Sequence, residues 1–159
     1  MVSVGFSTTN MWLSRFIRWL TKSKVSHTWL TFTDATLQRQ MVMEASFWGF
    51  RVVTMAEFKK DSTVIAIIPP KVPLDTATVA AADWLGDYYD FEGLVGAGVV
   101  SFWYTWFKRR IKSPFHSGTA LFCSESVVKV LQTANYPGAA ALDALAITPE
   151  QLLEFLQAK

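Results

Sequence analysis

The sequence of 159 residues contains a single cysteine and only two histidines. One cysteine cannot form an internal disulfide, so the hydrophobic core must hold the fold together without covalent cross-links. A tetrahedral zinc site generally takes three or four Cys or His side chains. We therefore expect neither a metal ion nor another cofactor.

The chain also lacks a strong charge of either sign. Fifteen Lys and Arg against thirteen Asp and Glu give a formal net charge of +2. Nucleic-acid-binding domains concentrate Lys and Arg on one face, and the one dense basic run here covers residues 108–112. We expect no nucleic-acid partner. This run directly follows an apolar stretch, so it indicates either a solvated helix end or the flank of a membrane-surface segment.

No segment has the pattern of a signal peptide or of a membrane span. Arg15 and Arg18 interrupt the first apolar stretch, which lacks a preceding basic region. The aromatic segment 91–107 contains Glu92 and is shorter than the roughly 20 apolar residues that a spanning helix needs. It predicts a buried helix or loop, or else a substrate-facing or membrane-facing surface. We expect a cytoplasmic protein, or one that a phage delivers without a signal peptide, with possible peripheral membrane contact through residues 91–112.

What the chain does contain is enough apolar material for one core. Hydrophobic residues make up 51% of the sequence and include seven Trp and twelve Phe. A domain of this length can bury roughly 68–70% of its unfolded surface. Repeats, low-complexity tracts and linkers are absent from the sequence. We expect a single domain over residues 1–159, with its oligomeric state left open.

Hydrophobic periodicity places strands mainly in the first half of the chain and helices mainly in the second. Period-two alternation or short β-rich runs predict strands over 2–6, 26–33, 38–45, 50–54 and 63–68. Helices are expected over 10–20, 75–85 and 122–134, and from Thr148 onward, with Asn10, Asp75 and Thr148 as N-caps and Pro149 at the first helical position.

Cys123 is the first candidate for chemistry. It lies in the sequence FCSES at the expected start of an amphipathic helix whose apolar stripe is formed by Val127, Val130, Leu131 and Ala134. Backbone amides and the helix dipole stabilise a thiolate at such a position, and the thiolate is the reactive form. The alternative is an inert cysteine buried in the core.

His27 and Glu44 are predicted to meet across a hairpin. If Thr33 lies opposite Gln38, the loop covers residues 34–37, and antiparallel pairing sets His27 directly opposite Glu44, with Cβ atoms about 4.5–5.5 Å apart. The carboxylate would then hold one imidazole nitrogen while the other faces the thiol, as in a nucleophile–base–orienter triad. A one-residue slip would destroy this arrangement. Otherwise Glu44 is an exposed strand carboxylate and His27 a structural histidine.

Other residues compete less well for these roles. His116 lies nearer to Cys123 in the sequence, but it stands in an expected loop with no acidic residue nearby to orient it. Ser124 and Ser126 lack the GxSxG elbow that would make either of them a nucleophile.

Five short motifs follow one another in a characteristic order. They are Ser26-His27, Glu44-Ala45, Tyr89-Asp90, Cys123-Ser124-Glu125 and Thr148-Pro149. The order resembles that of the circularly permuted NlpC-type papain-like cysteine hydrolases, particularly the YiiX-like group, in which the histidine strand precedes the cysteine helix. The resemblance implies an α+β fold of permuted papain-like type, in which a small antiparallel sheet packs against the helix that carries the nucleophilic cysteine.

By the same resemblance the protein is a cysteine hydrolase of amidase or peptidase type, with Cys123, His27 and Glu44 as catalytic residues. Tyr89 and Ser124 are candidates for oxyanion or substrate binding. The substrate would be an amide bond of a peptide or of peptidoglycan. Two alternatives stay open: a lipid-directed thiol hydrolase or acyltransferase, like the relatives that resemble lecithin:retinol acyltransferase, and a non-catalytic binding module whose partner surface is the aromatic segment.

Overall fold

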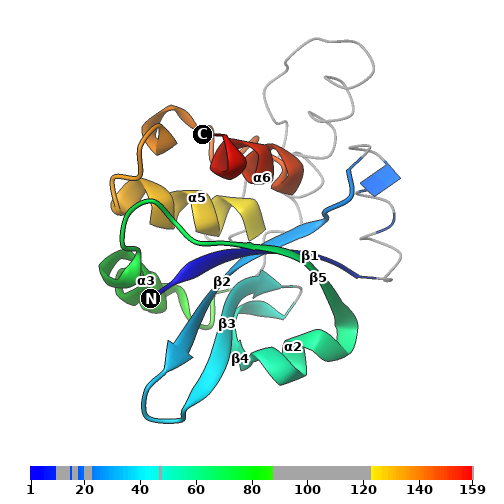
Figure 1. Cartoon of the computed structure of the whole chain (residues 1–159), viewed down its shortest axis with the longest axis vertical. Helices are drawn as coiled ribbons and strands as arrows, with labels where there is room; N and C mark the ends of the chain where they lie inside the picture. The colour runs from blue at the N-terminus through cyan, green and yellow to red at the C-terminus, as the bar shows by residue number, and fades with distance from the viewer. Residues whose placement is uncertain (10–14, 16–17, 20–22, 47, 88–122, 159) are drawn as a thin grey trace.

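The computed structural model describes residues 1–9, 15, 18–19, 23–46, 48–87 and 123–158 (Figure 1). Tyr89, His116, the aromatic segment 91–107 and the basic run 108–112 lie outside these residues. Of the helix expected over 10–20, residues 15, 18 and 19 are described, and all three are helical.

The five expected strands form one antiparallel sheet. They are β1 (Ser3–Thr9), β2 (His27–Asp34), β3 (Arg39–Ser46), β4 (Gly49–Thr54) and β5 (Ser62–Ile68), in the order β4-β3-β2-β1-β5. The strand expected over 2–6 extends further than predicted, because β1 pairs with β5 as far as Thr9 opposite Ser62.

Four α-helices accompany the sheet in the described part of the chain, which therefore has an α+β fold. They are α2 (Met55–Asp61), α3 (Asp75–Ala81), α5 (Cys123–Thr133) and α6 (Pro149–Gln157), with 3₁₀ turns at Ala82–Trp84 and Ala139–Ala141. The start of α6 is confirmed: the Thr148 hydroxyl accepts a hydrogen bond from the Gln151 backbone N–H, and the Gln151 side chain accepts one from the Thr148 N–H.

Two expectations about helices were wrong. Helix α2 was not expected, although its signal is present: the Thr54 hydroxyl accepts the Glu57 N–H at 3.2 Å, and Met55 and Phe58 are buried one turn apart. Asp75 is the first residue of α3 rather than its N-cap, which is Leu74, and the α-helix ends at Ala81. The chain there tightens into the 3₁₀ turn instead of continuing to residue 85.

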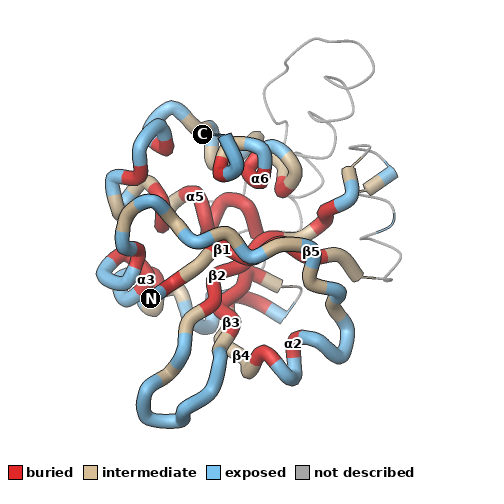
Figure 2. The backbone as a smooth tube through the Cα atoms, in the orientation of Figure 1, coloured by how far each residue is buried: buried red, intermediate tan, exposed pale blue. Residues whose placement is uncertain are grey.

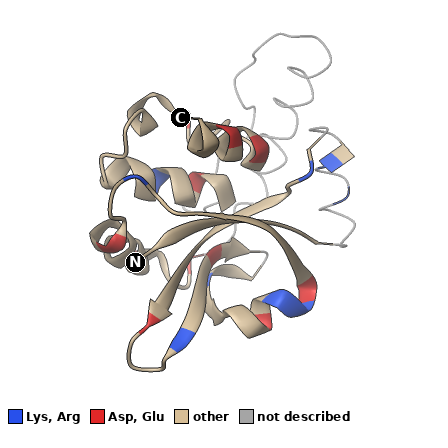
Figure 3. Ribbon diagram, in the orientation of Figure 1, with Lys and Arg blue, Asp and Glu red and all other residues tan. Residues whose placement is uncertain are grey.

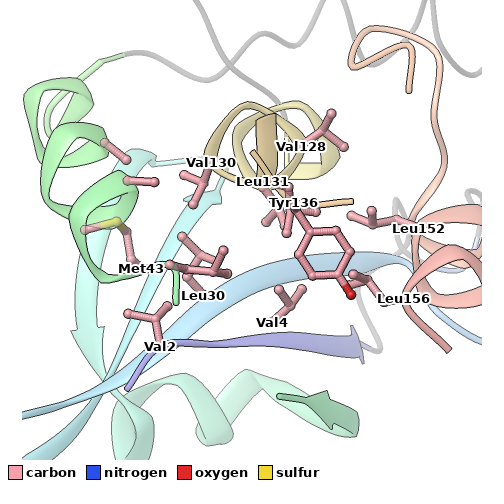
Figure 4. Packing of buried hydrophobic residues seen from close by; sticks show 14 of the residues in the cluster. Val2, Val4, Leu30, Met43, Val128, Val130, Leu131, Tyr136, Leu152 and Leu156 are labelled. Carbon is pink, nitrogen blue, oxygen red and sulfur yellow. The ribbon is translucent and has the colours of Figure 1, made fainter. Parts of the chain in front are cut away.

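The sheet is covered on both faces (Figures 1 and 2). Helices α5 and α6 lie on one face, and α2 packs on the other. The larger core fills the α5–α6 side and includes Val4, Leu30, Met43, Leu131 and Leu152 (Figure 4). A smaller cluster on the α2 side consists of Trp29, Val42, Met55 and Phe58. Because β2 is buried on both faces, its position between the two layers is fixed by packing.

Trp29 sits directly on the backbone of Gly5. A Cβ atom at position 5 would lie 2.3 Å from the Trp29 ring, far inside van der Waals contact. The indole N–H of Trp29 also donates to the Ser7 hydroxyl at 3.1 Å. Glycine is therefore required here for close approach, and the ring is held at both its face and its edge.

The hairpin between β2 and β3 differs from the expected register by two residues. Leu30 pairs with Met43 and Asp34 with Arg39, so the loop covers residues 35–38 rather than 34–37. Gln38 has a φ of 49°, a turn conformation that excludes it from the ladder. Continued to the start of β2, this register sets Glu44 beside Trp29 rather than beside His27. A shift by two keeps the side-chain parity, so His27 and Glu44 still share a face as diagonal neighbours.

Candidate active site

The start of α5 meets the start of β2 at one end of the sheet. The pairs between β2 and β3 end at Leu30–Met43, so residues 27–29 extend beyond that ladder. Cys123, the first residue of α5, lies here, and its sulfur accepts hydrogen bonds from the backbone N–H groups of Thr28 and Ser124. The thiol of Cys123 is buried.

His27 links Cys123 to Glu44. The imidazole Nε2 lies 2.7 Å from Glu44 Oε2. The imidazole is also hydrogen-bonded to the Cys123 side chain. Glu44 is only 3% exposed, which excludes the alternative of a solvent-exposed strand carboxylate. The three residues that the sequence singled out are therefore in contact in one chain of hydrogen bonds.

Arg51 extends this chain and was not among the sequence-based candidates. It lies directly opposite Glu44 on β4, and its Nε and Nη2 atoms donate to Glu44 Oε1 at 2.9 and 2.8 Å. The signal was available in the sequence: the short turn between β3 and β4 sets residues 44 and 51 on one face of a second hairpin. Pairing those two expected strands would have found it.

The contacts set the charge states of the three groups. Burial disfavours the imidazolium form of His27, but hydrogen bonds to Cys123 and Glu44 and the negative charges of both partners outweigh it and raise its pKa from 6.5 to about 10. Burial likewise opposes ionisation of Cys123, yet the His27 hydrogen bond and charge and the two backbone N–H groups lower the pKa of the thiol. Glu44 is buried too, and contacts with His27 and then Arg51 lower its pKa. The site thus favours a thiolate–imidazolium pair.

An aromatic wall supports the imidazole from the α2 side. The rings of His27 and Phe58 stack with centroids 6.3 Å apart, and Phe58 in turn packs on Trp29 at 4.8 Å. The unexpected helix α2 thereby contributes to the site. A stacked ring restricts the rotation of the imidazole, which helps to keep one nitrogen on the carboxylate and the other on the sulfur.

The remaining site candidates fall into two groups. Ser124 is buried beside Cys123, and its backbone N–H is hydrogen-bonded to the sulfur. The Ser126 hydroxyl donates to the Cys123 carbonyl at 2.9 Å, so it is used within the helix. Tyr89 and His116 lie outside the described residues. Within the described ranges no three His, Cys, Asp or Glu side chains gather into a group that could hold a metal ion.

No protein-family model matches the sequence, and no curated protein matches it either. In the part of the chain that the structure describes, no helix is both long enough and apolar enough to cross a membrane. Evidence about the function therefore comes from the geometry of the site and from the sequence motifs.

The arrangement supplies the parts that nucleophilic catalysis requires. A sulfur at a helix start is hydrogen-bonded to an imidazole, and a buried carboxylate orients that imidazole. These are the roles of nucleophile, base and orienter, which define a triad irrespective of chain order.

Proposed function

We propose that the protein is a cysteine hydrolase that cleaves amide bonds of a peptide or peptidoglycan substrate through a covalent acyl-enzyme. The observation that carries this proposal is the hydrogen-bonded chain from Cys123 through His27 to the buried Glu44. A buried carboxylate is costly unless it is paired, so its place beside an imidazole that contacts the only cysteine favours catalysis over an inert core thiol.

The fold is consistent with the same assignment. We infer a permuted papain-like architecture, in which the histidine strand β2 precedes the cysteine helix α5. The antiparallel sheet, the helix that begins at Cys123 and the motif order support this inference. The amide substrate rests on the resemblance described above.

The mechanism follows from the charge states of the site. The Cys123 thiolate attacks the carbonyl carbon of the substrate, and a carbon–sulfur bond forms as the carbonyl π pair moves to oxygen. Collapse of the tetrahedral intermediate expels the amine, which takes its proton from the His27 imidazolium. The neutral imidazole then removes a proton from water, whose oxygen bonds to the thioester carbon. Collapse of this second tetrahedral intermediate breaks the carbon–sulfur bond, and the bonding pair leaves with the sulfur of Cys123. The products are the carboxylic acid and the restored thiolate–imidazolium pair.

Two further groups assist these steps in the proposal. The backbone N–H of Cys123, at the start of α5, would donate a hydrogen bond to the developing oxyanion. Glu44 keeps the His27 ring oriented toward the sulfur, and it stabilises the imidazolium that is present before the first proton transfer and again after the second.

Trapping the acyl-enzyme tests the proposal. The purified protein is mixed with p-nitrophenyl acetate, and intact-mass spectrometry follows acetylation while absorbance follows release of p-nitrophenolate. We expect a burst with acetyl on Cys123, followed by turnover. The burst should be absent in Cys123→Ala and slowed by about 10²–10⁴-fold in His27→Ala, the range that general acid–base catalysis contributes.

Peptide amides and isolated peptidoglycan are then tested for release of new amino groups. Cys123→Ser, which keeps the size of the side chain, is the matched control for folding and for contaminating activity. If the wild type shows no burst and no acetylated Cys123, while circular dichroism shows that it is folded, the hydrolase proposal is wrong.

A further inference from the structure

We propose that Arg51 is a positioning residue that sets the acid limit of the pH range in which Cys123 is a thiolate, acting through Glu44 and His27. This inference rests on the proposed function, because it concerns the regulation of the same site. Arg51 is separated from the sulfur by two residues, so the structure gives it no direct role in the chemistry.

The geometry assigns one oxygen of Glu44 to each neighbour. Oε2 accepts from His27 at 2.7 Å, and Oε1 accepts both the Nε and Nη2 donors of Arg51 at 2.9 and 2.8 Å. A proton on Oε1 would face the two Arg51 donors, and a proton on Oε2 would require His27 Nε2 to accept instead of donate, which an imidazolium cannot do. The fork from Arg51 therefore favours the ionised carboxylate and fixes its plane, and with it the oxygen that faces His27.

The charges along the chain alternate. Thiolate, imidazolium, carboxylate and guanidinium carry −1, +1, −1 and +1, so the four groups sum to zero. Without the guanidinium the same cluster carries a net charge of −1, and an excess negative charge at a buried site disfavours formation of the thiolate. Removal of Arg51 should therefore raise the pKa of the Cys123 thiol and move the acid limit of its reactivity to higher pH.

No other described cation occupies this position. On α2, which packs against β3 and β4, Lys60 pairs with Glu57 at the surface, and Lys59 and Asp61 are exposed. On α5, Glu125 pairs with Lys129 at 2.8 Å. The ribbons of α2 and α5 carry positions of both charges, coloured blue for Lys and Arg and red for Asp and Glu in Figure 3. None of these residues is recorded in contact with Glu44, whose ion-pair partners among the described residues are His27 and Arg51. The charge that Arg51 supplies therefore has no substitute there.

Partial exposure limits the size of the effect. The Arg51 side chain is 40% exposed, so water screens its charge more than it screens the charges of Glu44 and Cys123. An opposite charge in direct contact shifts a pKa by about 1–3 units, and Arg51 acts on the thiol through two intervening residues, Glu44 and His27. We therefore expect removal of the Arg51 charge to raise the pKa of the Cys123 thiol by about one unit, the lower end of that range.

The test is the pH profile of Cys123 alkylation by iodoacetamide, read by intact mass. Arg51→Gln removes the charge but leaves an amide that can still donate to Glu44, and Arg51→Met keeps the stem alone. Arg51→Lys restores the charge without the fork. Arg39→Gln, on the exposed end of β3, is the matched control, because it makes the same chemical change at the surface. Urea unfolding and circular dichroism check that each variant is folded.

We expect the acid limb of the profile to move up by about one pH unit in Arg51→Gln and in Arg51→Met, which means about ten-fold slower labelling at a fixed pH on that limb. Arg51→Lys should recover part of the shift, and Arg39→Gln should show none. If Arg51→Gln does not fold, Arg51→Met decides the question alone.

Two results would overturn the inference, and they are distinguishable. An activated thiol in the wild type together with an unshifted limb in the neutral Arg51 variants refutes the role of Arg51 and leaves the hydrolase proposal intact. A wild-type thiol that titrates near the ordinary cysteine value of about 8.5 refutes both.

Discussion

The contact between Gly5 and Trp29 makes Gly5→Ala an informative perturbation. The added methyl would lie 2.3–2.4 Å from three ring carbons of Trp29, whereas ordinary contacts begin at 3.4 Å. The ring must therefore move by about 1 Å or more. It cannot do so freely, because its N–H is bonded to Ser7 and its face packs on Phe58.

The expected cost follows from three contributions. Overpacking of this kind costs about 1–3 kcal/mol, and losing the indole hydrogen bond adds about 1 kcal/mol. Gly5 is not among the positive-φ glycines, so alanine also restricts the unfolded chain and returns about 0.4–1 kcal/mol. The net destabilisation should be about 1–3.5 kcal/mol.

Urea unfolding followed by circular dichroism measures this change. Trp29→Leu removes the clashing ring, so the double variant Gly5→Ala with Trp29→Leu should lose less stability than the sum of the two single variants. The displaced ring also pushes on Phe58 and thus on His27, so Gly5→Ala should slow alkylation of Cys123. A destabilisation below about 0.5 kcal/mol, or strict additivity in the double variant, would refute this account of the packing.

Three further outcomes are expected. Stability should fall as pH rises from about 9 to about 10, because the folded chain keeps the His27 proton, with a pKa of about 10, that the unfolded chain has already lost. Stability should also fall in acid, as pH drops through the lowered pKa of Cys123, because the folded chain has released a thiol proton that the unfolded chain still binds. Urea titrations from pH 4 to 10.5 measure this, and Cys123→Ala should flatten the fall in acid; an equally steep fall in that variant would contradict it. Thr148→Ala breaks the capping box of α6 and should cost about 1 kcal/mol, whereas the exposed Thr33→Ala, which caps nothing, serves as its control. Ser7→Ala leaves the buried indole N–H of Trp29 without its acceptor and should cost about 1–3 kcal/mol, so a neutral result would mean that this hydrogen bond contributes nothing to stability.

The sequence predicted the strands and the contact of His27 with Glu44, although the register predicted for the hairpin was wrong by two residues. Alternation fixes which face a strand residue occupies, and the two-residue error in register left that parity unchanged. The exact partners depend on the turn, where Gln38 adopts a left-handed conformation that no pattern in the sequence marked. A shift by one residue instead of two would have separated the histidine from the carboxylate.

The features that the sequence analysis missed depend on residues outside the five short motifs. The contact of Arg51 with Glu44 depends on the pairing of β3 with β4, for which the sequence analysis made no prediction. Helix α2 is marked only by a short capping pattern, in which the Thr54 side chain accepts the Glu57 N–H between two strands. Burial of Glu44 could not be read from its own strand, because residues of α2, α5 and β4 all pack around that region. These contacts convert an ordinary strand carboxylate into part of the site.

The pH dependence of Cys123 alkylation by iodoacetamide, compared among wild type, His27→Ala and Glu44→Gln, tests the central claim most directly. The protein has one thiol, so the mass increase reports on a single residue. We predict fast labelling below pH 7 in the wild type, its loss in His27→Ala and a weakened effect in Glu44→Gln, because the thiolate depends on the imidazolium that Glu44 orients. Slow labelling with a midpoint near about 8.5, the same in all three proteins, would contradict the claim that these residues form a catalytic triad.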